Sequence, residues 1–186
     1  MKNILHLFSL PLILLFFHNN TFAQIKISKS FTQKLQHMEM DFYEPLENSY
    51  KKIRVQRNDI IDYDFAIKAR KGDMEIRFAL YPDNDATKYP HINVMSMASS
   101  VATNDEEAKL VLHQLPSSEL KEYGADWGAM IFLQPKEMFT GKDHCKMLAL
   151  YKEGQGLAYA FFLFDKATEE VDVQKYCLGF KNNEEQ

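Results

Sequence analysis

Residues 145–165 show an alternation of apolar side chains that predicts a β-hairpin. Two apolar runs flank the segment 152–156, which contains two glycines and is typical of a turn. Successive side chains of a strand point to opposite faces, and here both sets are apolar. An antiparallel hairpin usually leaves one face in water. This hairpin should therefore lie at the centre of a sheet, with other elements packed on both of its faces.

Weaker alternation predicts further strands before this hairpin. They lie at residues 38–42, 51–57, 59–70, 74–81, 92–98 and 125–134. A turn at residues 71–73 joins two of these strands, which should pair as a second hairpin. The strand at 51–57 has a basic outer face that could meet an anionic partner. A charged sheet edge that discourages aggregation is the favoured interpretation of this face.

Apolar residues at helical spacing predict three helices, at 104–115, from Ser117 or Ser118 to Gly124, and at 168–180. The first begins at Asn104 much like a capping box. Its buried stripe would consist of Ala108, Val111, Leu112 and Leu115. The stripe of the last helix would consist of Val173, Tyr176, Cys177 and Phe180, although its valines also fit a strand. The polar residues 24–36 predict a loose lead-in or a short helix.

This order of elements resembles the PsbP-like family of α-β-α sandwich domains. The residues that carry the resemblance are MEMDFYEP at 38–45, ATND at 102–105, GADW at 124–127, FLQPK at 132–136 and LALYKEGQGLAYAFFLF at 148–164. The resemblance implies an α+β fold, in which an antiparallel β-sheet has helices packed on both faces. The family includes the extrinsic photosystem II subunit and various bacterial extracytoplasmic domains. Because the family is functionally mixed, the resemblance implies no activity and no photosynthetic role.

The N-terminus has the three-part pattern of a secretory signal peptide. Lys2 precedes an apolar run at 4–17, and the sequence Thr-Phe-Ala at 21–23 predicts cleavage before Gln24. The apolar run is short for a membrane span of about 20 residues. We therefore expect residues 24–186 to form a single periplasmic or secreted domain with no membrane span. The formal charge of −4 argues against a nucleic-acid partner.

No recognised catalytic, cofactor-binding or metal-ligating motif appears in the chain. The one suggestive cluster is Asp143-His144-Cys145, but neighbouring strand residues point to opposite faces and would not share a site. Asp62 and Asp64 are most simply part of a solvated strand face, and two carboxylates are too few for a calcium site. Four tyrosines near element ends suit either a partner surface or the edge of the core: Tyr43, Tyr81, Tyr89 and Tyr123. Asp126 could lie at the rim of a pocket, although a surface position beside a buried Trp127 is the simpler interpretation.

Cys145 and Cys177 could form a disulfide in an oxidising compartment. The bridge needs Cα atoms within about 7 Å of each other. A closing helix that folds back on the hairpin would place Cys177 part-way along it, whereas Cys145 lies near its end. This geometry slightly favours two unbridged thiols.

These observations favour an exported, non-enzymatic protein that binds an envelope protein or a small ligand, with no cofactor. The alternative is a small extracytoplasmic hydrolase whose active site is assembled from loops and leaves no motif in the sequence.

Overall fold

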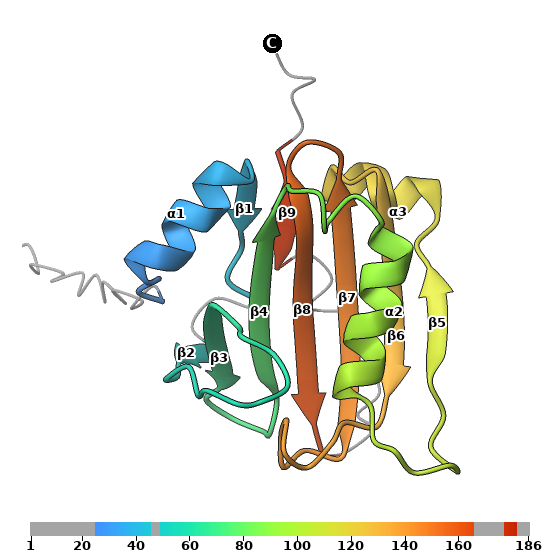
Figure 1. The fold of residues 1–186 in the computed structure, drawn as a ribbon. Coiled ribbons are helices and arrows are strands. Elements are labelled where there is room, and N and C mark those ends of the chain that lie inside the picture. Colours follow the sequence, from blue (N-terminus) through green and yellow to red (C-terminus); the bar gives the residue numbers. More distant parts are fainter. Residues whose placement is uncertain (1–24, 46–48, 166–176, 182–186) are drawn as a thin grey trace, which may run out of the picture.

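A computed structural model describes residues 25–45, 49–165 and 177–181, and in these residues the chain forms an α+β fold (Figure 1). Its main feature is an antiparallel sheet of seven strands in the order β2-β3-β4-β8-β7-β6-β5. The strands are β2 (Tyr50–Lys52), β3 (Phe65–Ala69), β4 (Glu75–Pro82), β5 (Val111–Gln114), β6 (Trp127–Leu133), β7 (His144–Lys152) and β8 (Gly156–Phe164). A separate two-stranded sheet pairs β1 (Met40–Phe42) with β9 (Leu178–Phe180). The helices are α1 (Lys29–His37), α2 (Pro90–Val101) and α3 (Ser117–Tyr123).

The predicted central hairpin is confirmed. Strands β7 and β8 lie in the middle of the large sheet, and all nine residues of β8 are buried. Alternate side chains of β8 enter two different hydrophobic cores. Ala158, Ala160, Phe162 and Phe164 enter the first core, and Leu157, Tyr159, Phe161 and Leu163 enter the second. We call these the α1 core and the α2 core, after the helix that contributes to each.

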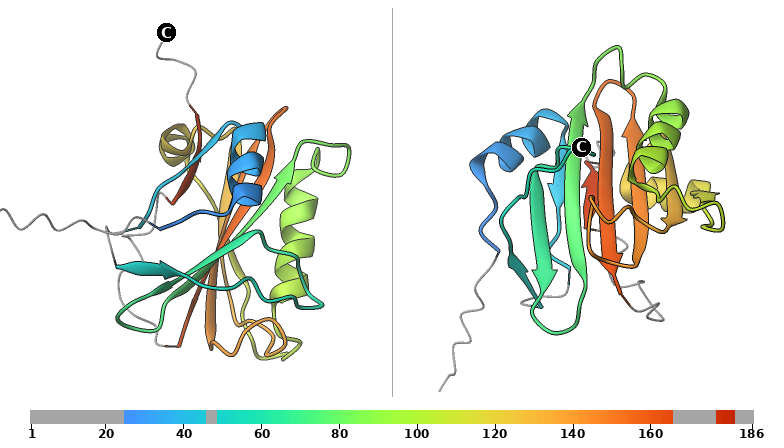
Figure 2. Two further views of the ribbon diagram at one scale, coloured as in Figure 1. Left: turned by 90° about the vertical axis from the view of Figure 1, so that its left-hand side faces the viewer. Right: turned by 60° about the horizontal axis from the view of Figure 1, so that its bottom comes forward.

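The α1 core is closed by α1, by the β1–β9 ribbon and by the end of α3 (Figure 2). Ser28 caps α1, because its Oγ accepts a hydrogen bond from the Phe31 backbone N at 3.3 Å. The Phe31 ring then stacks on the Phe65 ring of β3, with 4.8 Å between their centroids. Tyr123 of α3 is buried in the same core.

The α2 core is closed by α2 and by two long connections, residues 53–64 and 134–143. Val94, Ala98 and Val101 of the helix belong to this core. The first connection contributes Ile61 and Tyr63, and the second contributes Phe139. The helix and these loops therefore share one face of the sheet.

The strand expected at 92–98 is wrong, because these residues belong to helix α2. Pro90 occupies the first turn of the helix, where its missing N–H costs nothing. The buried residues of α2 recur at helical spacing: Pro90, Val94, Ala98 and Val101. A helical stripe of small apolar residues was therefore interpreted as strand alternation.

The helix expected at 104–115 is also wrong. The backbone instead turns at Asp105, whose Oδ1 accepts a hydrogen bond from the Glu107 N at 3.0 Å, and then enters β5. Strand β5 pairs with β6, so Val111 and Leu112 are 41% and 39% exposed rather than buried. Pairing with a distant strand overrides a local helical pattern here.

The closing helix expected at 168–180 is wrong at its end. Leu178, Gly179 and Phe180 form strand β9, which pairs residue by residue with β1. Residues 168–176 lie outside the described part of the chain, as do residues 1–23, where the signal peptide is expected. Within the described residues, no helix is long and apolar enough to cross a membrane.

The other expected elements are present with altered limits. The hairpin of β3 and β4 is confirmed, but β3 begins at Phe65 and the strand expected at 51–57 is only the three residues of β2. The lead-in contains the short helix α1. Helix α3 ends at Gly124, which takes a left-handed conformation with φ of 61°.

Cys145 and Cys177 form no disulfide with each other; both are buried, and they lie in different cores. Cys145 points from β7 into the α2 core, whereas Cys177 lies at the entry to β9 in the α1 core. The expectation that Cys177 belongs to a helical stripe is therefore wrong. The two thiols are unbridged for a different reason, because the large sheet lies between the cores that hold them.

We expect both thiols to resist alkylation in the folded protein. Burial raises the pKa of Cys177 to about 12. Burial raises the pKa of Cys145 further, although the positive charge of nearby Arg77 acts to lower it. The reactive thiolate is therefore scarce at pH ~8. Since the folded state holds these protons more tightly than the unfolded state, the free energy of unfolding should fall as the pH rises above about 9. Mass spectrometry after iodoacetamide treatment should show no adduct in buffer and two adducts in urea. A mass gain of two hydrogens on reduction would contradict the unbridged state.

Candidate functional site

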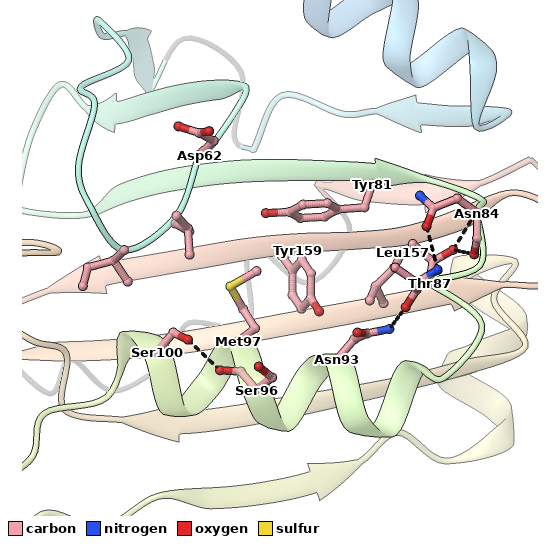
Figure 3. Close-up of a pocket in the computed structure, with 13 residues that line it drawn as sticks. Asp62, Tyr81, Asn84, Thr87, Asn93, Ser96, Met97, Ser100, Leu157 and Tyr159 are labelled. Atoms are coloured by element: carbon pink, nitrogen blue, oxygen red, sulfur yellow. Dashed lines mark hydrogen bonds between the residues drawn. The ribbon is translucent and has the colours of Figure 1, made fainter.

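A cavity with a volume of about 460 Å³ lies between α2, the connection 53–64 and the sheet face formed by β4 and β8 (Figure 3). Ligand pockets in proteins typically measure roughly 300–1,000 Å³. The cavity is therefore large enough for a small organic molecule.

The sheet supplies a pair of tyrosines to the cavity. Tyr81 of β4 and Tyr159 of β8 pack edge to face, with 5.8 Å between ring centroids and an interplanar angle of 85°. Leu157 lies beside them, directly opposite Tyr81 in the strand register. The floor of the cavity is therefore aromatic and apolar.

Helix α2 supplies a side of the cavity that is polar apart from one methionine. Asn93, Ser96, Met97 and Ser100 line it at positions i, i+3, i+4 and i+7. This spacing places all four on one face of the helix. The same helix buries Val94 and Ala98 in the α2 core, so the packing of the helix fixes the direction of its polar face.

The connection 53–64 supplies the opposite apolar side through Ile60 and Ile61. Asn58 holds this turn, because its Oδ1 accepts hydrogen bonds from the Ile60 N and the Ile61 N, both at 2.9 Å. The Tyr63 hydroxyl accepts a hydrogen bond from the Gln56 N at 2.7 Å. The connection is therefore a fixed wall of the cavity.

The turn after β4 closes one end of the cavity. Thr87 is buried, and its Oγ1 accepts a hydrogen bond from the Asn84 N at 2.9 Å. Asn93 of α2 donates from Nδ2 to the Ala86 carbonyl oxygen at 2.6 Å. These bonds join the turn to the helix and set the width of the cavity at this end.

Two phenol hydroxyls reach the cavity without a partner among the described residues. Tyr159 is only 1% exposed, and neither its hydroxyl nor that of Tyr81 makes a hydrogen bond to any described residue. Burial raises the pKa of Tyr159 well above its usual value of 10, and neighbouring Tyr81 adds to this effect. Burial also raises the pKa of Tyr81, with smaller contributions from the charges of Asp64 and Asp62. Both hydroxyls are therefore protonated at neutral pH and can donate a hydrogen bond.

The described lining of the cavity contains few titratable groups. Apart from the two tyrosines, Asp62 is its one titratable side chain, and Asp62 is exposed at the cavity edge. The hydroxyl of Ser100 donates to the Ser96 carbonyl oxygen at 2.9 Å, and no histidine, lysine or carboxylate activates either serine in the described structure. Nor does any group of three or more potential metal ligands occur in the described residues.

The cluster Asp143-His144-Cys145 does not form a site. Cys145 is buried in the α2 core, whereas His144 is exposed and its ring lies 5.5 Å from that of Phe164 on the other face. This separation was expected from strand alternation. Asp126 is exposed and accepts a hydrogen bond from the Glu153 N, while Trp127 is buried.

Asp62 and Asp64 do not share a strand face, because both precede β3. Asp64 forms an ion pair with Lys34 at 2.7 Å and accepts a hydrogen bond from the Leu80 N at 2.8 Å. Its role is to connect α1, β4 and the segment before β3. Asp62 alone contributes to the cavity.

Sequence reasoning identified Tyr81 as a tyrosine near an element end but did not group it with other residues. It missed the polar face of α2, because residues 92–98 were interpreted as a strand. Pro90 at the start of that helix and the spacing of Asn93, Ser96, Met97 and Ser100 were the available signals. Tyr159 had no such signal, because it looks like any core residue of the hairpin.

Comparison of the chain with models of protein families, with curated proteins and with solved structures finds no match.

Proposed function

We propose that this chain is an exported, non-enzymatic protein of the PsbP-like α-β-α type that binds a small ligand in the cavity beside α2. The observation that carries the proposal is the hydroxyl of Tyr159, which reaches the cavity and makes no hydrogen bond to any described residue. A tyrosine hydroxyl can both donate and accept a hydrogen bond. A ligand in the cavity can therefore pair with it in either role.

Two further features support the proposal. The signal-peptide pattern at residues 1–23 favours export to the periplasm or the exterior. The cavity combines apolar walls with a few hydrogen-bonding groups, which is the usual composition of a small-molecule site.

The proposal predicts that the protein retains a small molecule when it is purified from its native extracytoplasmic fraction. Met97→Trp should fill the cavity and abolish this retention, and Tyr159→Phe should weaken it about five- to tenfold by removing one hydrogen bond. Native mass spectrometry of the purified protein measures the retained mass. The matched control is Met95→Trp, which adds the same side chain on the outer face of α2, where Met95 is 42% exposed.

Retention that is equal in Met97→Trp and Met95→Trp would contradict the proposal, as would the absence of any retained molecule from the unmodified protein. Hydrolysis of an ester, phosphate or glycoside substrate that Ser96→Ala abolishes would replace the proposal by the alternative of a small hydrolase.

A further inference from the structure

The described side chains that line the cavity include no positive charge, and the one charge at its edge is the carboxylate of Asp62. Nearby cations are engaged elsewhere. Lys34 is paired with Asp64 at 2.7 Å, and Lys88 is paired with Asp85 at 2.7 Å. Arg77, on the same sheet face, is paired with Glu75 at 2.7 Å. The one charged side chain of the described lining is therefore the exposed carboxylate of Asp62, and no lysine or arginine of the lining opposes it.

We propose that the cavity selects a small organic cation: an amine or quaternary ammonium attached to an apolar body. This inference rests on the proposed function and specifies the ligand of the same site. The apolar body would contact Ile60, Ile61, Met97 and Leu157, and the charged head would lie toward the tyrosine pair and Asp62.

The tyrosine pair supplies suitable groups for a cationic head. The Tyr159 ring lies nearly parallel to the Phe161 ring, with 5.9 Å between centroids, so the aromatic contact is assigned to Tyr81, the less buried ring of the pair. A cation within about 6 Å of an aromatic face is attracted by the negative charge of that face. The unpartnered phenol oxygens of Tyr81 and Tyr159 add lone pairs that accept N–H donors.

The pKa of Tyr81 is raised chiefly by burial, and nearby carboxylates make a smaller contribution in the same direction. The charges of Asp64 and Asp62 add to burial in raising the Tyr81 pKa, because they disfavour a second negative charge at this hydroxyl. A field that opposes a phenolate also opposes an anionic ligand and favours a cation at the same position. An anion would in addition find no lysine or arginine in the described lining.

Three ligands that share a carbon skeleton test this inference: 4-phenylbutylamine, 4-phenylbutan-1-ol and 4-phenylbutanoate. Isothermal titration calorimetry of the protein, freed of any retained molecule, measures the Kd of each. We expect the amine to bind roughly tenfold more tightly than the alcohol. The carboxylate should bind more weakly than both.

Three variants locate the effect. Met97→Trp should abolish binding of the amine and of the alcohol, which shows that both occupy the cavity. Asp62→Asn should reduce the preference for the amine several-fold while the Kd of the alcohol stays the same. Asp59→Asn is the matched control, because Asp59 is an exposed residue of the same connection that does not line the cavity, and it should change neither Kd.

An alcohol or carboxylate that binds as tightly as the amine would overturn this inference and leave the proposed function standing. A preference that Asp62→Asn does not reduce would overturn the charge argument. Suppose that none of the three ligands binds while the protein still retains a molecule that Met97→Trp excludes. In that case the inferred class of ligand, an organic cation, is wrong and the proposed function holds. If there is neither binding nor retention, both proposals fail.

Discussion

Gly156→Ala should destabilise the protein by about 3–5 kcal/mol, because an alanine there combines backbone strain with a steric clash. Gly156 begins β8 with φ of 122°, a backbone conformation that residues with a Cβ rarely adopt. An added Cβ would lie 2.8 Å from the Asp83 N and closer still to the Tyr81 carbonyl oxygen. These are backbone atoms, which cannot move aside like the end of a side chain.

The position of Gly156 makes relaxation costly. Its register partners are Pro82 in β4 and Lys152 in β7, so the backbone at this point joins three strands. A shift that relieves the clash would disturb the pairing of β4 with β8. It would also displace Tyr81, which belongs to the cavity.

Gly154→Ala is the control for this prediction. Gly154 lies two residues earlier in the same turn with φ of 73°, and an added Cβ would meet no atom within 4 Å. Only the strain of the left-handed conformation remains, which costs roughly 1–2 kcal/mol. Urea unfolding of both variants measures the difference. Equal losses of stability in the two variants would show that the clash at Gly156 is relieved in the folded protein.

The central hairpin could be predicted because its signal is local. Each strand alternates within nine residues, and the turn lies between them, so one continuous segment contains all the information. Burial on both faces followed from the apolar character of both sets of side chains. No knowledge of the packing partners was needed.

Two of the errors share a different cause, which is pairing between distant segments. Val111 and Leu112 fit a helical stripe, but hydrogen bonding with β6 makes them part of an edge strand. Leu178–Phe180 fits the end of a helix, but its partner strand β1 lies near the other end of the chain. In both cases local spacing fitted two structures, and a partner far away in the sequence decided between them.

The candidate site was the least predictable part of the molecule. Ile60, Tyr81, Ser96 and Tyr159 come from four separate segments and share no motif. Their proximity follows from the pairing of β4 with β8 and from the packing of α2 on that face. The misassignment of α2 as a strand alone was enough to hide the site.

Arg77→Met should destabilise the protein by about 3–5 kcal/mol, because it removes one partner of a largely buried ion pair. Arg77 is only 5% exposed, and its Nε donates to the Glu75 Oε1 at 2.7 Å. Its Nη1 donates to the Phe139 carbonyl oxygen at 2.6 Å. The guanidinium also lies between the rings of Tyr63 and Phe139, 5.0 Å and 4.9 Å from their centroids.

These contacts fix two loops on the sheet. Tyr63 lies near the end of the connection 53–64, whose Ile60 and Ile61 form a wall of the cavity, and Phe139 belongs to the connection 134–143. Loss of the guanidinium would leave the Glu75 carboxylate without its partner and both loops without a common anchor. Faster amide hydrogen exchange in residues 53–64 should therefore accompany the loss of stability.

Three further variants separate the contributions of charge and shape. Arg77→Lys keeps the charge but loses the planar group that fits between two rings, so its stability should fall between those of the unmodified protein and Arg77→Met. The double variant Glu75→Leu with Arg77→Met should recover part of the loss, because no unpaired carboxylate remains. Lys88→Met breaks the exposed pair with Asp85 and should change the free energy of unfolding by no more than about 1 kcal/mol. Urea unfolding compares all four variants, and an effect of Arg77→Met as small as that of Lys88→Met would mean that Arg77 does not anchor the two loops.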